Sequence, residues 1–370
     1  MKPETAAIHL SNQVNDLYQP VIQPITLSTT YLHGESSLVY GRFANPNRAS
    51  LERVMAALEL GREAAAFSSG NTAGMAVFQC LEQGSHVVAP LDMYHGLKKQ
   101  LLEVFRDTLA VTFVDMTQPE QVRSAIKPET SLIWVESPSN PLIQITNIPL
   151  IAQIAKEAKV RMICDNTFAT PILQNPLTLG ADMVMHSATK YIGGHSDVLA
   201  GILVTKEADE FWQSIKTVQA IGGAVPSPFD CYLLCRSIKT LAYRMKGHCA
   251  NAQAVAEYLH QHPLVEKVIY PGLPSDPGYT LAGELMRGFG GMVTFLVKGG
   301  AKESDRFVQS LRYFSNATSL GGVESLIERR AHVEGPDSKS PENLIRMSVG
   351  LENIADLTED LASGLKTLGK

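Results

Sequence analysis

Short apolar runs rich in β-branched residues recur along the first two thirds of the chain. They lie at 64–67, 86–89, 111–115, 132–136, 161–164, 183–185 and 202–205. Helical stretches, for example 98–105 and 148–159, separate most of these runs. Such alternation predicts a mostly parallel sheet that helices cover on both faces.

The two ends of the chain follow other patterns. The first forty or so residues lack clear periodicity, with Pro20 and Pro24 between short β-prone pieces, so we expect an arm that packs on something else or is partly disordered. Beyond about residue 235 a helical stretch at 238–261 precedes separate β-like runs. These runs lie at 265–270, 292–297 and 344–349. The pattern predicts an arm over 1–45, a large α/β domain over 46–237 and a smaller α+β domain over 238–370.

One helix is predicted between the arm and the first strand. Leu51, Val54, Met55 and Leu58 have the i, i+3, i+4, i+7 spacing of an amphipathic helix, and Gly61 follows as the predicted stop.

Composition narrows the class of function. Hydrophobic residues make up 45% of the 370 residues and charged residues 19%, which is typical of a globular protein. The net charge of −5 argues against a nucleic-acid or acidic-membrane partner. The five cysteines form no zinc-binding pattern, so no metal is expected. Without a signal-like or membrane-spanning apolar run, we expect a soluble, cytoplasmic protein that acts on small molecules.

Polar residues follow five of the predicted strands, at the edge where ligands bind in open α/β sheets. These exits are 68–71, 92–94, 136–140, 165–167 and 186–190. Ser69, Gly70 and Asn71 lead into a helix-prone stretch, where free backbone N–H groups suit a phosphate or belong to a plain N-cap. Ser187 and Thr189 add two hydroxyls beside Lys190.

Single residues at this edge suggest cofactor chemistry. Lys190 is either a Schiff-base lysine or a solvated loop lysine. Asp165 ends an apolar strand and suits a pyridinium nitrogen, and no further ligands accompany it for a metal. Tyr94 suits stacking on an aromatic ring, or it is a half-buried tyrosine. Arg346 lies inside an apolar run and needs a carboxylate from the protein or a substrate.

The stretch 182–196, DMVMHSATKYIGGHS, resembles the attachment motif of the Cys/Met metabolism family of pyridoxal-phosphate enzymes. That family includes cystathionine γ-synthase, cystathionine β- and γ-lyases, methionine γ-lyase and O-acylhomoserine sulfhydrylase. The resemblance covers nearly the whole chain. Its other elements are 5–10, 24–31, 40–46, 136–141, 165–168, 227–230, 319–322 and 346–350.

The resemblance implies a fold-type-I architecture with pyridoxal 5′-phosphate as the cofactor. Lys190 would hold the cofactor as a Schiff base and then shuttle the substrate proton, Asp165 would hold the ring nitrogen, and Tyr94 would stack on the ring. Arg346 would bind the substrate carboxylate. The remaining implied cofactor or substrate contacts are Tyr40, Arg42, Ser69, Gly70, Asn71, Asn140, Thr167, Ser187, Thr189 and Ser319. Tyr40 and Arg42 would act from a neighbouring subunit, in a homodimer with shared sites that is expected to pair into a homotetramer.

Some positions depart from the family pattern. His95, Gly96 and Leu97 replace a glycine-rich run after Tyr94, and 328–335 replaces a His-Pro-Ala-Ser-Met-Thr-His-like loop. Thr318 stands where γ-synthases and γ-lyases often carry Glu, which favours β-lyases and sulfhydrylases.

We therefore expect a sulfur amino-acid enzyme, first a cystathionine lyase, β or γ. Cystathionine γ-synthase, O-acylhomoserine sulfhydrylase and methionine γ-lyase are the alternatives. Lys190, Asp165 and Arg346 together argue against a catalytically silent regulatory protein. The Tyr40 and Arg42 element argues against a fold-type-I aminotransferase.

Overall fold

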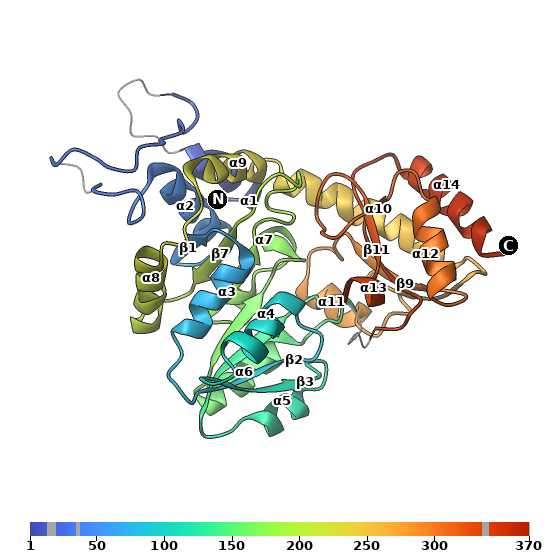
Figure 1. The fold of residues 1–370 in the computed structure, drawn as a ribbon, viewed down its shortest axis with the longest axis horizontal. Helices are drawn as coiled ribbons and strands as arrows, with labels where there is room; N and C mark the ends of the chain where they lie inside the picture. The colour runs from blue at the N-terminus through green and yellow to red at the C-terminus, as the bar shows by residue number, and fades with distance from the viewer. Residues whose placement is uncertain (13–19, 35–37, 335–339, 370) are drawn as a thin grey trace. The chain divides into compact units, whose positions relative to one another are not determined.

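The structure is a computed structural model that describes residues 1–12, 20–34, 38–334 and 340–369 (Figure 1). The chain forms two compact units. The first consists of Met1–Ser137 and Thr146–Ala242, and the second of Pro138–Ile145 and Tyr243–Lys370. The second unit thus takes a short segment, 138–145, from the middle of the first, and its main part begins a few residues after the start predicted at 238.

A seven-stranded sheet forms the centre of the first unit. Its strands lie in the order β1 (Glu63–Phe67), β7 (Gly201–Thr205), β6 (Met183–Ser187), β5 (Arg161–Asp165), β4 (Thr130–Glu136), β2 (His86–Pro90) and β3 (Ala110–Val114). The five strands from β6 to β3 are parallel, whereas β7 runs antiparallel to both neighbours. Every apolar run predicted in this part forms a strand, and the mostly parallel sheet is confirmed.

Helices bury the sheet because its strands are apolar on both sides. Alternate strand residues such as Trp134 and Ile163 share a core with α3 (Gly70–Gln79), α4 (His95–Lys99) and α8 (Glu210–Gly222). The residues between them, such as Met162 and Cys164, are also buried. The remaining helices are α2 (Pro46–Leu58), α5 (Pro119–Ala125), α6 (Ile148–Ala158), α7 (Thr170–Leu173), α9 (Pro228–Ile238), a π-helical turn Gln100–Val104 and a 3₁₀ turn Pro176–Leu179.

Helix α2 ends by a mechanism that differs from the prediction. Leu60, with a φ of 59°, is the left-handed residue after the helix, and the N–H of Gly61 donates back to the Ala56 carbonyl at 2.8 Å. Gly61 serves another purpose: a Cβ there would collide with the Val204 side chain on β7. The glycine therefore permits close packing, and a leucine accepts the strained conformation.

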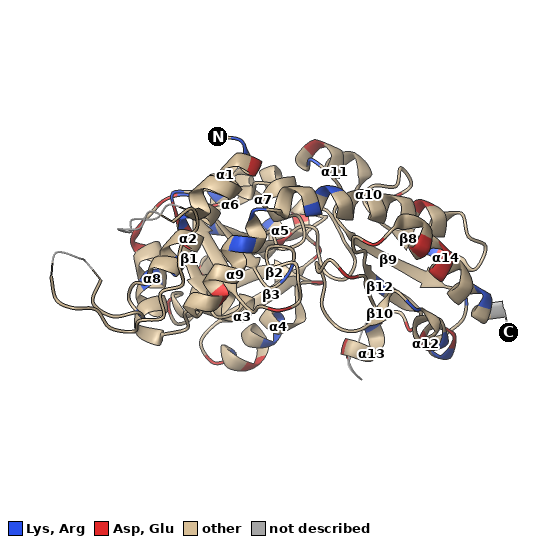
Figure 2. Cartoon of the chain, turned by 90° about the horizontal axis from the view of Figure 1, so that it is seen from above, with Lys and Arg blue, Asp and Glu red and all other residues tan. Residues whose placement is uncertain are grey.

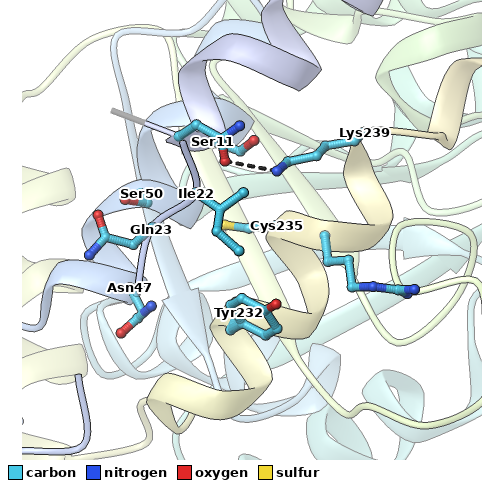
Figure 3. A pocket seen from close by; sticks show the side chains of 10 residues that line it. Ser11, Ile22, Gln23, Asn47, Ser50, Tyr232, Cys235 and Lys239 are labelled. Atoms are coloured by element: carbon cyan, nitrogen blue, oxygen red, sulfur yellow. Dashed lines mark hydrogen bonds between the residues drawn. The ribbon is translucent and has the colours of Figure 1, made fainter. Parts of the chain in front are cut away.

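The N-terminal segment is more regular than expected, although part of the arm predicted over 1–45 lies outside the described residues. It begins with helix α1 (Pro3–His9) and a 3₁₀ turn, Leu10–Asn12, which pack on α2. A cavity of about 240 Å³ lies between this turn, residues 22–23, α2 and α9 (Figure 3). At its wall Lys239 Nζ donates to Asn12 Oδ1 at 2.8 Å and ties the segment to the end of α9.

The second unit contains a five-stranded sheet in the order β10 (Ser315–Asn316), β11 (Leu326–Arg329), β12 (Leu344–Ser348), β9 (Met292–Val297) and β8 (Val265–Ile269). Its helices are α10 (Leu241–His260), which begins in the first unit, α11 (Tyr279–Leu285), α12 (Ala301–Ser310), α13 (Arg330–Glu334), α14 (Ile354–Leu365) and a 3₁₀ turn Lys366–Gly369. The three predicted β-like runs are β8, β9 and β12, whereas β10 and β11 were missed. The helix predicted at 238–261 is a separate one from α9, which ends at Ile238.

Basic and acidic residues are interspersed over the helices (Figure 2). Within the described part of the chain, no helix has the length and apolarity required to cross a membrane.

Candidate active site

The start of α3 lies against the end of β6. Ser69 is the N-cap: its Oγ accepts the Thr72 amide at 3.1 Å, and Thr72 Oγ1 accepts the Ser69 amide at 2.9 Å. Helix geometry leaves the amides of Gly70 and Asn71 without an intrahelical acceptor. A Cβ on Gly70 would lie 2.8 Å from Ser187 Cβ, so these amides are close to the Ser187 hydroxyl. Two N–H groups at a positive helix end beside a hydroxyl suit a phosphate.

Gly201 on β7 makes this approach possible. It lies in register between Phe67 of β1 and Ser187 of β6. A Cβ at this position would collide with the carbonyl oxygen of Ser69. The turn before α3 can therefore settle directly on β7, next to Ser187, only because residue 201 has no side chain.

Thr167 joins the ends of β5 and β6. Its hydroxyl donates to Asp165 Oδ1 at 2.5 Å and accepts the Ser187 amide at 2.9 Å. The Thr167 amide donates to the same Asp165 oxygen at 3.0 Å. These bonds fix the Asp165 carboxylate next to the predicted phosphate position and leave its second oxygen for another partner.

The surroundings of the Asp165 carboxylate favour a cationic ligand. It is 5% exposed, and Oδ2 has no hydrogen-bond partner among the described residues. Burial raises the pKa of Asp165, partly opposed by the hydrogen bonds from Thr167 and by the charge of His186. A protonated pyridine nitrogen would supply both the missing donor and the missing positive charge. The residues of this edge thus fit a pyridoxal phosphate: amides and a hydroxyl at the phosphate end, and a carboxylate at the ring end.

Lys190 lies three residues after Ser187, in the turn that follows β6, and is half-buried. Its amide donates to the Ser187 carbonyl at 3.2 Å, and its carbonyl accepts the Gly194 amide at 2.7 Å. Thr189 in the same turn has its hydroxyl engaged with the backbone of Ala200, at 3.1 Å from the amide and 3.3 Å from the carbonyl. In this arrangement Thr189 shapes the turn that carries Lys190, and its predicted phosphate contact stays a prediction.

Tyr94 is the N-cap residue that precedes α4 and lies beside the start of α3. Its amide donates to Glu136 Oε2, at the end of β4, at 2.7 Å. A Cβ on Gly96 would lie 2.6 Å from Tyr94 Cε1 and 2.9 Å from Asn71 Oδ1. The tyrosine ring and the Asn71 side chain therefore flank Gly96, within the run 95–97 that departs from the family pattern. Tyr94 is 41% exposed.

A buried polar network behind β6 had no counterpart in the sequence prediction. Glu59 and His186 are fully buried, and His186 Nε2 lies 2.6 Å from Glu59 Oε1. Asn166 donates to the same oxygen at 2.8 Å. In the sequence Glu59 follows a helix and resembles an ordinary surface residue. The only sequence signal for this buried network was His186 inside an apolar strand.

The predicted substrate-binding residues lie together in the second unit. Arg346 on β12 donates to Asn140 Oδ1 at 2.7 Å and to the Ser319 carbonyl at 3.3 Å. Thr294 on β9, next to Arg346 in register, donates to the Pro141 carbonyl at 2.8 Å. The segment 138–145 is thus bound to the sheet by side chains of neighbouring strands. Ser319 has a φ of 149°, a strained value of the kind found at functional sites.

Tyr40 and Arg42 lie on a loop whose arginine packs against the end of α8. Arg42 donates to the Ala220 carbonyl of α8, and its guanidinium stacks on Phe43 at 4.5 Å. Buried Arg48 holds the loop by donating to the carbonyls of Gly41 and Arg42 at 3.0 and 3.2 Å. No contact within the described residues joins Tyr40 or Arg42 to Gly70 or Ser187, and their role in a neighbouring subunit stays a prediction.

Comparison with known proteins identifies the family of this chain. A model of the family "Cys/Met metabolism PLP-dependent enzyme" matches residues 4–366. A cystathionine γ-synthase of Mycobacterium tuberculosis is 45% identical over 98% of this chain and 96% of that protein. A cystathionine β-lyase of Coxiella burnetii is 40% identical over 98% of this chain and 97% of that protein.

A solved structure, MetB from Corynebacterium glutamicum, superposes with a TM-score of 0.97 at 40% identity, over 100% of this chain and 98% of that one. The expected fold-type-I architecture is therefore confirmed. Since the family model spans nearly the whole chain and the ends of β5 and β6 fit the cofactor, this protein belongs to the Cys/Met metabolism family of PLP-dependent enzymes, with pyridoxal phosphate as its cofactor.

Proposed function

We propose that the protein breaks the carbon–sulfur bond of cystathionine or a closely related amino acid. The observation that carries the proposal is the Asp165 carboxylate, buried with one oxygen unpaired, at the strand end next to the turn that carries Lys190. A family member that retains both groups keeps what is required to remove a proton from Cα and stabilise the resulting carbanion.

When bound, pyridoxal phosphate would supply an electron-poor ring as an electron sink for chemistry at Cα. Asp165 keeps the ring nitrogen protonated through Oδ2, while Thr167 holds Oδ1. Lys190 Nζ removes the proton from Cα and returns it to a later atom of the substrate. Tyr94 stacks on the ring, and Glu136 fixes the backbone position from which the tyrosine extends.

Substrate orientation is assigned to the second unit. Arg346 binds the α-carboxylate by a bidentate, charge-assisted pair, for which the planar guanidinium is suited. Asn140 and the Ser319 carbonyl orient this guanidinium by accepting hydrogen bonds from it. A carboxylate held there fixes which bond at Cα is broken.

Cystathionine lyase is the first choice, and within it the β-lyase, because Thr318 places no carboxylate where γ-synthases and γ-lyases often carry Glu. Cystathionine γ-synthase is the second candidate, favoured by the relative of that name from M. tuberculosis. The two candidates differ in what happens after the proton leaves Cα, not in the groups that remove it.

Product identification separates these candidates. The purified holoenzyme is incubated with L-cystathionine, and separately with L-cysteine plus an O-acylhomoserine. Pyruvate from cystathionine identifies a β-lyase and 2-oxobutyrate a γ-lyase, whereas cystathionine formed in the second mixture identifies the synthase. Absence of product and of α-proton exchange in both mixtures would overturn the proposed function.

A further inference from the structure

Arg346 shares a carboxylate with a second arginine. Glu328 lies directly opposite Arg346 in the β11–β12 register. Its Oε1 is 2.5 Å from Arg346 Nη2 and 2.5 Å from Arg330 Nη1. Two guanidinium groups therefore contact one oxygen of one glutamate.

The three groups are removed from water. Side-chain exposure is 4% for Arg346, 3% for Glu328 and 8% for Arg330. The other Glu328 oxygen, Oε2, is buried without a hydrogen-bond partner. Charges in such a place interact strongly, so the balance among them decides how readily Arg346 accepts a further anion.

A substrate carboxylate that reaches Arg346 meets a guanidinium that is already paired with Glu328. If Glu328 had only Arg346 as its cation, the two carboxylates would compete for one guanidinium. Arg330 removes this competition, because Glu328 still has a cation to pair with when Arg346 binds another anion. The spare oxygen Oε2 lets the Glu328 carboxylate rotate toward Arg330. Charges then alternate from Arg330 through Glu328 and Arg346 to the incoming carboxylate.

Arg330 is itself fixed from the solvent side. Glu334, one turn later in α13, accepts from Arg330 Nη2 at 3.0 Å and from Nε at 3.3 Å. Glu334 is more exposed than Glu328, with 16% of its side chain accessible, so its charge is better screened. The bonds to Glu334 orient Arg330 toward Glu328 while leaving it net attraction for the buried carboxylate.

We propose that Arg330 and Glu328 are positioning residues that set the affinity of Arg346 for the substrate carboxylate, Arg330 by restraining Glu328 from competing with it. The proposal rests on the carboxylate-binding role given to Arg346 under the proposed function. It assigns a purpose to the stretch 328–335, where this chain departs from its family.

The test uses the holoenzyme and a double-mutant cycle. Arg330→Met should raise the KM for L-cystathionine, or for the O-acylhomoserine if the enzyme is a synthase, by about tenfold with little change in kcat, since binding of the carboxylate is weakened in ground and transition states alike. Adding Glu328→Gln to Arg330→Met should return KM to near the wild-type value. If Arg330 only supports the fold, the double variant would be no better than the single one, and the proposal would be wrong.

A direct binding measurement complements the kinetics. The probe is 4-(methylthio)butanoate, a carboxylate without an amino group that cannot react, and the comparison is its uncharged amide. Calorimetry should show that Arg330→Met weakens the carboxylate by about tenfold and leaves the amide unchanged. Equal loss for both probes would contradict a charge-based effect.

Two further variants distinguish failure of this inference from failure of the role assigned to Arg346. Arg329→Met is the matched control, because this neighbouring arginine pairs with Asp305 and Glu342 instead and should leave KM unchanged. Arg346→Met tests the underlying assumption: if it binds the carboxylate probe like the wild type, both the assigned role of Arg346 and this inference are refuted. If Arg346→Met loses the probe but Arg330→Met does not, only this inference fails.

Discussion

The backbone N–H of Tyr94 is bound to the carboxylate of Glu136 at 2.7 Å. Glu136 lies at the end of β4, in register with Asp165 on β5, and is 4% exposed. The loop that carries Tyr94 is thereby tied to β4, the strand next to the one that carries Asp165, the aspartate proposed to bind the cofactor. A shift of one strand end would therefore displace both Tyr94 and Asp165.

Glu136→Ala should lower kcat by about tenfold and destabilise the fold by about 1–3 kcal/mol, the range for a lost buried hydrogen-bond partner. Glu136→Gln keeps an acceptor oxygen and is the matched control, with most activity retained. Steady-state kinetics and denaturant unfolding measure the two effects. Equal behaviour of the alanine and glutamine variants would refute a role for the acceptor.

Lys190 is predicted to carry the cofactor. The purified protein should be yellow, and borohydride reduction should fix the cofactor on the peptide that contains Lys190. Peptide mass analysis identifies the labelled residue. Lys239, which is bound to Asn12, serves as an internal comparison and should stay unlabelled. A label on any lysine other than Lys190 would contradict the assignment.

Asp165 should have opposite effects on apoprotein stability and on catalysis. Burial raises its pKa in the folded apoprotein, so folding disfavours the charged form. The resulting destabilisation is present above the folded-state pKa and vanishes below the unfolded value of about 4. Asp165→Asn should therefore raise the apoprotein Tm at pH 7, and this gain should shrink as the pH falls toward 4.

With cofactor bound, the same Asp165→Asn change should lower α-proton exchange by at least about two orders of magnitude, because the ring nitrogen loses its anionic partner. Cofactor should still bind through the phosphate end. Exchange followed by NMR in deuterated water measures the loss, with Asp209→Asn, a surface carboxylate paired with Arg161, as the control. Exchange at the wild-type rate would exclude the assigned role.

Tyr40 and Arg42 lead to a prediction about assembly. They match a phosphate-binding element of the family but make no described contact with Gly70 or Ser187 of their own chain. If they complete the site of a neighbouring subunit, the smallest active species is a symmetric dimer. Mixing inactive Arg42→Ala with inactive Lys190→Ala subunits should restore activity, since some mixed dimers contain one intact site. No recovery after verified subunit exchange, or turnover by a stable monomer, would refute the shared site.

The strands of the first unit were predictable because buried parallel strands read as short apolar runs, and polar residues then mark their ends. Asp165, Thr167 and Ser187 were recognised on that basis, and the structure joins them by hydrogen bonds. The strand β11 was missed because Glu328 and Arg329 make it look like a loop. The structure accounts for these charges by ion pairs: Glu328 pairs with Arg330 and Arg346, and Arg329 pairs with Asp305 and Glu342.

Contacts between residues far apart in sequence were beyond local reasoning. Glu59 and His186 are 127 positions apart, and neither is recognisable as half of a buried pair without the fold. Helix α1 was missed for a different reason: seven residues beginning with a proline give too short a pattern to distinguish from an irregular arm.

The close packing at Gly201 limits which substitutions this position can tolerate. The spacing between the start of α3, where the phosphate is proposed to bind, and the turn that carries Lys190 depends on the absence of a side chain at residue 201, since a Cβ there would collide with Ser69. The smallest substitution, Gly201→Ala, should therefore weaken cofactor binding although it lies away from the reacting atoms. It would separate the start of α3 from the turn that carries Lys190. A single added methyl group in β7 should therefore be measured as a weaker affinity for the phosphate of the cofactor.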